Sequence, residues 1–101
     1  MGIKEKVQRE LNKINLNISK IEEELATLPK GSIVSVERNN NLYCYLKRRS
    51  GDTIESLYLG RENEENVLNF SLQIEKRKAL EGKLKKLKEE QRLAEKMLKV
   101  R

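Results

Sequence analysis

The chain has 101 residues and a net charge of +6, with 38% charged and only 4% aromatic side chains. This length leaves room for one small domain, and a composition rich in Lys, Glu and Leu favours long helices over a packed globule. Its one cysteine, Cys44, excludes an internal disulfide. We therefore expect a single domain over residues 1–101 in a reducing, cytoplasmic compartment.

The positive charge is unevenly placed along the chain. Residues 1–29 hold five basic and five acidic side chains, whereas residues 30–61 hold six basic and three acidic ones. Residues 62–101 hold eleven basic and eight acidic side chains. An excess of this sign favours an anionic partner such as nucleic acid, although it describes a long-range field and does not define a site.

Several classes of function have no signature in the sequence. No apolar run approaches the roughly 20 residues that a membrane-spanning helix needs, so we expect no membrane partner. There is no His, no second Cys, no glycine-rich phosphate loop and no serine-based motif. The acidic stretch 61–66 lacks the Asp and Gly spacing of a calcium loop. We therefore predict a protein without enzymatic activity, metal or cofactor.

Residues 3–28 predict the first helix. Apolar side chains recur there at alternating intervals of three and four, which is the seam of a coiled coil. The seam consists of Leu11, Ile14, Ile18, Ile21, Leu25 and Leu28. The motif LPKG at 28–31 then ends the helix, because Pro29 cannot donate the next backbone hydrogen bond and Gly31 tolerates left-handed geometry.

The apolar repeat changes to a period of two between residues 32 and 60. Three runs read as strands, namely SIVSVER (32–38), LYCYLKRR (42–49) and TIESLYLG (53–60). The motifs NNN (39–41) and SGD (50–52) separate them and are typical of turns. The sequence therefore predicts a three-stranded antiparallel meander. Because such a small sheet is marginal by itself, one of its faces must pack on the helices or on a partner.

Residues 63–100 predict the second helix, with Asn63 as its amino-terminal cap. Its apolar positions form two seams, first Val67, Phe70 and Ile74, and then Leu80, Leu84, Leu87, Ala94 and Leu98. Arg77 and Gly82 interrupt the pattern between the seams. Gly82 indicates a bend or a close helix crossing, because glycine disfavours a helix interior.

Together these segments predict an α+β fold that is mostly α. Two antiparallel helices form a coiled-coil hairpin, and the small three-stranded antiparallel β-meander is inserted between them. The first helix is the shorter one, so apolar residues of the second stay unmatched, and we expect a homodimer. The predicted dimer contacts are Leu80, Leu84, Leu87 and Leu98.

The middle strand of the predicted meander carries the candidate binding face. Because side chains alternate along a strand, aromatic rings and cations fall on one face of it. Rings can stack on bases, cations can contact phosphates, and a β-ribbon can enter a DNA groove. The assigned residues are Tyr43, Tyr45, Lys47 and Arg49, with Arg38, Arg61 and Lys30 at the margin. The alternative is that the tyrosines cover the helices and the basic side chains form a solvated edge.

A second basic candidate is the pair of lysine-rich runs at 76–78 and 83–88. Such a stripe can follow a nucleic-acid backbone. Glutamates are interleaved with these lysines, however, which is typical of the ordinary polar face of a coiled coil. The sequence therefore favours the solvated face for this stripe.

The motifs LPKG (28–31) and LYCYLKRRSGDTIESLYLG (42–60), followed by a long charged helix, resemble a widespread set of small uncharacterised bacterial, archaeal and phage proteins. The resemblance implies an aromatic hairpin between coiled-coil helices. The hairpin is also similar to hairpins near the amino termini of transposases and phage-type recombinases, which implies DNA binding. This chain departs from those relatives in having Asp52 and Thr53 where they place basic residues.

These observations lead to three hypotheses about function. The first is a non-enzymatic protein of a phage or mobile element that binds nucleic acid or a nucleoprotein complex through Tyr43, Tyr45, Lys47 and Arg49. The second is a phage-encoded inhibitor that binds a host protein, such as a nuclease of the CRISPR type. The third is a structural coiled-coil adaptor in which the meander only caps the helix pair.

Overall fold

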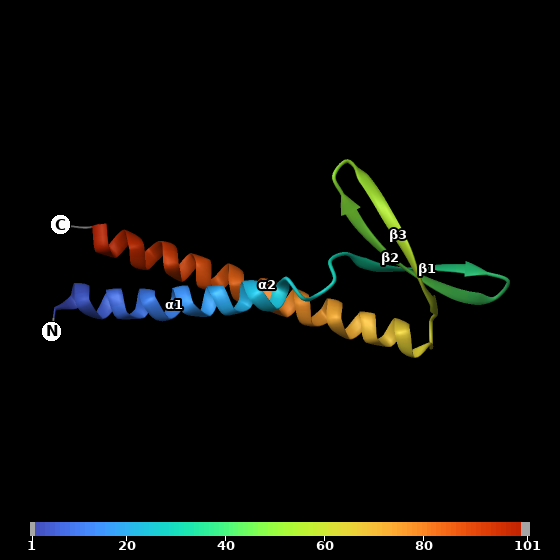
Figure 1. Ribbon diagram of the computed structural model, residues 1–101, viewed down its shortest axis with the longest axis horizontal. Helices are drawn as coiled ribbons and strands as arrows, with labels where there is room; N and C mark the ends of the chain where they lie inside the picture. The colour runs from blue at the N-terminus through green and yellow to red at the C-terminus, as the bar shows by residue number, and fades with distance from the viewer. Residues whose placement is uncertain (1, 100–101) are drawn as a thin grey trace. The chain divides into compact units, whose positions relative to one another are not determined.

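The computed structural model describes residues 2–99 and contains two helices and three strands (Figure 1). The elements are α1 (Ile3–Leu25), β1 (Ser32–Arg38), β2 (Asn41–Ser50), β3 (Thr53–Arg61) and α2 (Glu65–Lys99). The strands form one antiparallel sheet in the order β1-β2-β3. This confirms the predicted α+β fold, mostly α, with a meander between two helices. Val100, the last residue of the predicted second helix, lies outside the described residues.

The chain divides into two compact units. Within the described part of the chain, residues 2–27 and 79–99 form a helical unit, and residues 28–78 form a sheet unit that includes the first part of α2. The single domain predicted over residues 1–101 stays a prediction. Among residues 2–99, neither helix combines the length and the apolar character that crossing a membrane would require.

The helical unit pairs α1 with the second part of α2 in antiparallel orientation (Figure 1). Leu11, Ile18 and Leu25 of α1 are buried, as the heptad spacing predicts. The Gln91 side chain donates a hydrogen bond of 2.8 Å from its Nε2 to Oδ1 of Asn15. This bond fixes the relative register of the two helices at one polar position within an apolar seam.

The four predicted dimer contacts are half-buried within the single chain. The heptad spacing places them on the stripe of α2 that also carries Gln91 and the buried Ala94. They are Leu80, Leu84, Leu87 and Leu98. Their partial burial fits the seam with α1, and the homodimer stays a prediction.

The first helix ends at Leu25, so its predicted end at Leu28 is wrong. The Ala26 N–H donates to the Glu22 carbonyl, and the Thr27 N–H donates to the Glu24 carbonyl three residues back, each at 3.1 Å. The Thr27 hydroxyl donates to the same Glu24 oxygen at 2.7 Å. The chain thus tightens into a turn, because the residue before a proline disfavours helical geometry and Pro29 offers no N–H to extend the helix.

Gly82 lies in the interior of an uninterrupted α2, and a Cβ added there would meet nothing within 4 Å. The predicted close crossing at this glycine is therefore wrong. We expect Gly82→Ala to raise the free energy of unfolding by about 0.5–1 kcal/mol, because alanine loses less backbone entropy in a helix. Urea unfolding followed by circular dichroism measures the change. Ala79→Gly, at an exposed position of α2, is the reciprocal control and should lower stability by a similar amount.

Two tight turns connect the strands of the sheet unit. Arg38 pairs with Asn41 across the first turn, whose central residues Asn39 and Asn40 have φ of 52° and 64°. Ser50 pairs with Thr53 across the second turn, where Gly51 has φ of 63°. Asparagine and glycine are the residues that tolerate positive φ in two-residue hairpins. Both predicted turns are confirmed.

The core of the sheet unit lies between one face of the sheet and the first part of α2. Its buried members are Cys44, Leu46, Leu59, Val67 and Ile74. Cys44 is only 2% exposed, which confirms that it faces the apolar side of its strand. The first predicted seam of the second helix therefore covers one face of the sheet and leaves the other face open.

Polar contacts hold both ends of this part of α2. The helix begins at Glu65 and not next to Asn63, and the Glu64 carbonyl accepts the N–H of Leu68 at 3.2 Å. The Asn66 side chain donates to the Leu59 carbonyl at 2.8 Å. At the other end, Nη1 of Arg77 donates to the Leu28 carbonyl at 3.0 Å.

Candidate functional site

The open face of the sheet carries the aromatic and basic residues that the sequence singled out. Directly paired residues of an antiparallel sheet project their side chains from the same face. Tyr45 pairs with Tyr58, and Tyr43 pairs with Arg61. We call this surface the tyrosine face and define it by Arg38, Tyr43, Tyr45, Lys47, Arg49, Tyr58 and Arg61.

Three tyrosine rings form a connected cluster at the centre of the tyrosine face. The ring centroids of Tyr45 and Tyr58 are 5.3 Å apart with an interplanar angle of 57°. Those of Tyr43 and Tyr58 are 6.4 Å apart with an angle of 42°. Tilted pairs at these distances are favourable for aromatic rings. Tyr58 is the shared member and is 51% exposed, so the cluster is accessible to solvent.

An irregularity in β3 brings Arg61 onto this face. Cys44 pairs with Gly60 and Tyr45 pairs with Tyr58, so Leu59 is an extra residue without a partner in β2. Leu59 is buried in the core, which places it on the side that α2 covers. Strict alternation from Tyr58 would turn Arg61 toward that covered side. The bulge instead re-aims it, as bulges commonly do for side chains near functional surfaces.

The re-aimed guanidinium lies over an aromatic ring. Its central carbon is 5.8 Å from the centroid of the Tyr43 ring. A cation over a ring face at this distance is attracted by the negative charge of the π system. Arg61 and Tyr43 thus place a cation against an aromatic ring at the end of the cluster.

A shallow hollow opens beside the rings. Its volume is about 370 Å³, and it is lined by Arg38, Asn39, Tyr43, Tyr45 and Tyr58. All three strands and the first turn contribute to it, so its shape depends on the registers of β1 with β2 and of β2 with β3. The hollow combines apolar ring faces with a guanidinium and an amide, which are groups that recognise flat heteroaromatic ligands.

The two faces of the sheet carry different charges. Arg38, Lys47, Arg49 and Arg61 are exposed on the tyrosine face, and within residues 2–99 no ion pair engages any of them. The acidic side chains of the strands, Glu37 and Glu55, alternate onto the opposite face.

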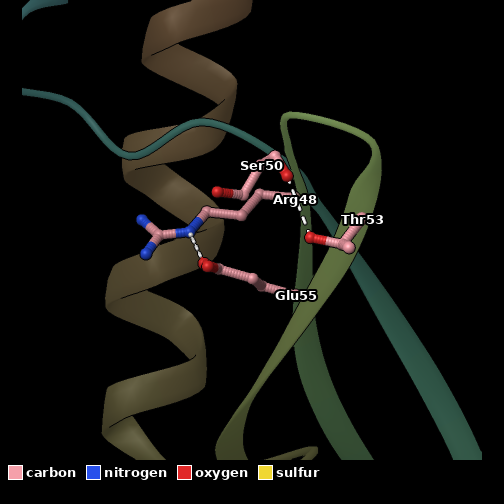
Figure 2. A network of polar contacts seen from close by, with 4 residues as sticks. All are labelled: Arg48, Ser50, Thr53 and Glu55. Atoms are coloured by element: carbon pink, nitrogen blue, oxygen red, sulfur yellow. Dashed lines mark hydrogen bonds and ion pairs between the residues drawn. The ribbon is translucent and has the colours of Figure 1, made fainter.

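That opposite face contains a neutralised cation. Nε of Arg48 lies 3.0 Å from Oε2 of Glu55 (Figure 2). Next to this pair, the Thr53 hydroxyl donates to the Ser50 carbonyl at 2.9 Å and braces the second turn (Figure 2). The net positive charge of the meander therefore projects from the tyrosine face.

The hydroxyl of Tyr58 stays protonated to a higher pH than that of an ordinary tyrosine. Desolvation by its surroundings, followed by the negative charge of Glu64, raises the pKa of Tyr58 above its ordinary value of 10.0, while Arg61 opposes the shift. Below that pH the group is neutral and keeps its O–H donor. The centre of the cluster can therefore donate a hydrogen bond at physiological pH.

The structure places most of the predicted site residues together. Tyr43, Tyr45, Lys47 and Arg49 share the face of β2 that α2 leaves open, and Arg38 and Arg61 join them. The residues that pack against α2 are Cys44, Leu46 and Leu59, so the tyrosines do not cover the helix. Lys30 is exposed but precedes β1.

Sequence reasoning left Tyr58 out of the site, although it is the central ring. The sequence shows Tyr58 only as part of the motif SLYLG, which does not by itself reveal the face of the sheet on which the ring lies. Only the pairing of Tyr58 with Tyr45 assigns it to the tyrosine face, and that pairing follows from the length of the second turn.

The lysine-rich runs of α2 differ from the tyrosine face. Neighbouring acids pair with some of the cations of this helix, including Lys78 with Glu75 at 3.9 Å and Arg92 with Glu89. Pairs at this spacing on an exposed helix surface are typical of a solvated coiled-coil face. They support the interpretation of these runs as a polar surface.

Among residues 2–99, no group of three or more Cys, Asp or Glu side chains is placed to hold a metal ion. No protein-family model matches the chain, and no curated protein or solved structure matches it.

Proposed function

We propose that this chain is a non-enzymatic nucleic-acid-binding protein and that the tyrosine face is its contact surface. One observation carries the proposal: three adjoining tyrosine rings and four exposed cations share one open face of the sheet. The acidic side chains of the strands project from the other face. Nucleic acid offers the matching chemistry, because its bases have π faces and its backbone is anionic.

Each part of the tyrosine face has a task in such a complex. Stacking of a base on an aromatic side chain contributes about 1–3 kcal/mol per base. Exposed lysines and arginines replace the counterions of phosphates, which gives affinity that falls with salt. Arg61 does both, because a guanidinium already lying over Tyr43 can stack and can contact a phosphate.

The resemblance of residues 42–60 to hairpins of transposases and phage-type recombinases agrees with this proposal. Under it, the chain acts in a phage or mobile element as a nucleic-acid or nucleoprotein-binding module. The helical unit then serves as a support or as a contact for other proteins. The inhibitor and adaptor hypotheses differ from it in one respect: neither requires the tyrosine face to bind an oligonucleotide.

Charge reversal on the tyrosine face tests the proposal. Labelled DNA and RNA oligonucleotides are titrated with the full chain by fluorescence anisotropy across a series of salt concentrations. We expect Lys47→Glu with Arg49→Glu to weaken binding at least about tenfold at low salt and to reduce the salt slope by about 2, because two phosphate contacts are lost.

A matched control separates a local contact from net charge. Lys4→Glu with Lys6→Glu changes the net charge by the same amount on exposed positions of α1, and acidic residues in a first helical turn favour the helix dipole. This control should change affinity much less than the reversal on the sheet. Undetectable binding at low salt, or an equal loss in the two double variants, would contradict the proposal.

A further inference from the structure

We infer that the tyrosine face binds an unpaired strand, with one base seated in the hollow between Arg38, Asn39 and the tyrosine rings. This inference rests on the proposed function and specifies which form of nucleic acid the face accepts. Four features support it: the geometry of the rings, the volume of the hollow, the width of the sheet and the positions of the cations along β2.

The ring cluster is accessible to a nucleic-acid base whose flat face is not covered by a neighbouring base. Tyr58 is tilted by 57° from Tyr45 and by 42° from Tyr43, and all three tyrosines line a hollow that is open to solvent. In a duplex, each base is covered above and below by its neighbours and presents only its edges in the grooves. Stacking on a tyrosine therefore requires a base that has left the stack.

The hollow has the size and lining of a small-ligand site. Its volume of about 370 Å³ falls at the lower end of the range of about 300–1,000 Å³ that is typical of small-molecule pockets. Ring faces of Tyr45 and Tyr58 supply its apolar surface, while Arg38 and Asn39 supply polar groups. An amide and a guanidinium can pair with the exposed edge of a base.

The width of the sheet argues against entry into a duplex groove. A major groove about 12 Å wide admits a helix or a two-stranded ribbon. β2, which carries Tyr43 and Tyr45, is the central strand and has a neighbour on each side. Three strands span about 10 Å between the outer backbones before side chains are added. A three-stranded sheet with its side chains is therefore wider than the two-stranded ribbon that a major groove admits, which favours contact with an unpaired strand over entry into a duplex.

The cations lie along the path that a single strand would follow. Arg61 is paired with Tyr43 near the beginning of β2, and Lys47 and Arg49 lie near its end. Tyr43 and Arg49 are separated by about 20 Å at the usual rise of a strand. Phosphates of a short single strand can contact the cations at both ends while its bases stack on the rings between them.

The test compares one oligonucleotide sequence as a single strand and as a blunt duplex, each titrated with the full chain at the same low salt. We expect the single strand to bind at least about tenfold more tightly than the duplex. Tyr58→Ala should weaken single-strand binding by about 5- to 150-fold, which corresponds to the loss of one stacked base. Tyr58→Phe should restore most of that affinity, because it keeps the ring.

Leu57→Ala is the matched control, since Leu57 is an exposed neighbour whose side chain projects from the opposite face. It should leave single-strand affinity within about twofold of the parent chain. Circular dichroism checks that each variant keeps its secondary structure. The exposure of Tyr58 makes its replacement compatible with folding.

The outcomes distinguish the inference from the proposed function. If neither form binds, the proposed function itself fails. If the duplex binds as tightly as the single strand, nucleic-acid binding stands and the inference is overturned. Equal effects of Tyr58→Ala and Leu57→Ala on single-strand affinity would overturn the inference as well.

Discussion

Replacement of Leu46 by alanine is expected to lower the free energy of unfolding of the sheet unit by about 2–5 kcal/mol. Leu46 is 3% exposed and belongs to a core that also contains Cys44, Leu59, Val67 and Ile74. Removing the branched end of the Leu46 side chain leaves a cavity between β2 and α2. The few surrounding side chains cannot close this cavity. In a unit with such a small core, this loss is a large part of the total stability.

The measurement can be made specific to the sheet unit. All three tyrosines lie in β2 and β3, and the chain has no tryptophan. Urea unfolding followed by tyrosine fluorescence therefore reports this unit, whereas circular dichroism at the helical band reports both units.

Leu57 provides the control for Leu46, because it is the cross-strand partner of Leu46 on the same face but is 55% exposed. Leu57→Ala should cost well under about 1 kcal/mol. Equal losses for the two leucines would contradict the position of the core.

Replacement of Gly31 by alanine is expected to lower the free energy of unfolding by about 1–3 kcal/mol or more. Gly31 has φ of 122°, a backbone conformation that side chains with a Cβ rarely adopt. An added Cβ would overlap the backbone carbonyl oxygen of Lys47 and would lie 3.2 Å from both the Cβ of Arg48 and a methyl carbon of Leu46. Because the first overlap is with backbone, β1 would have to move away from β2.

Gly51→Ala separates the two contributions to that cost. Gly51 also has positive φ, at 63°, but a Cβ there would meet nothing within 4 Å. Gly51→Ala should therefore lower the free energy of unfolding only by the cost of the backbone conformation, about 1–2 kcal/mol. Tyrosine fluorescence in urea measures both variants. A loss at Gly31 no larger than that at Gly51 would show that the close approach to β2 does not matter.

The main elements follow from patterns that depend on local sequence. The change from a seven-residue to a two-residue repeat marks the boundary between α1 and β1, and the motifs around Asn39 and Gly51 mark the turns. The alternation along β2 assigns Tyr43 and Tyr45 to the face opposite Cys44, as the structure confirms. These features need no knowledge of which elements touch one another.

The remaining features depend on contacts between distant residues. Arg77, which interrupts the apolar pattern of α2, donates a hydrogen bond to the carbonyl of Leu28, a residue far away in the sequence. The bulge at Leu59 depends on how β3 pairs with β2, and it decides the position of Arg61. The helix end at Leu25 is a local feature, because the Thr27 hydroxyl binds the Glu24 carbonyl three residues earlier, but it does not follow from the apolar spacing that extends to Leu28.

The expected homodimer is a property of more than one chain and stays a prediction. Apolar side chains of α2 that are exposed in the single chain are Leu68, Leu72, Leu93 and Met97. Scattered exposed apolar residues are normal on a protein surface. Light scattering of the full chain would give the mass of the particle and decide the point.

The unpaired Leu59 decides whether Arg61, three residues after Tyr58, adds its positive charge to the tyrosine face. If the same residues paired without the bulge, the inward and outward positions of every residue after Leu59 would be exchanged. The guanidinium of Arg61 would then move from the solvent to the hydrophobic core. The tyrosine face would lose a cation although the amino-acid composition of the chain stays the same. We therefore expect a one-residue insertion to be tolerated better at the two hairpin tips than in these few residues.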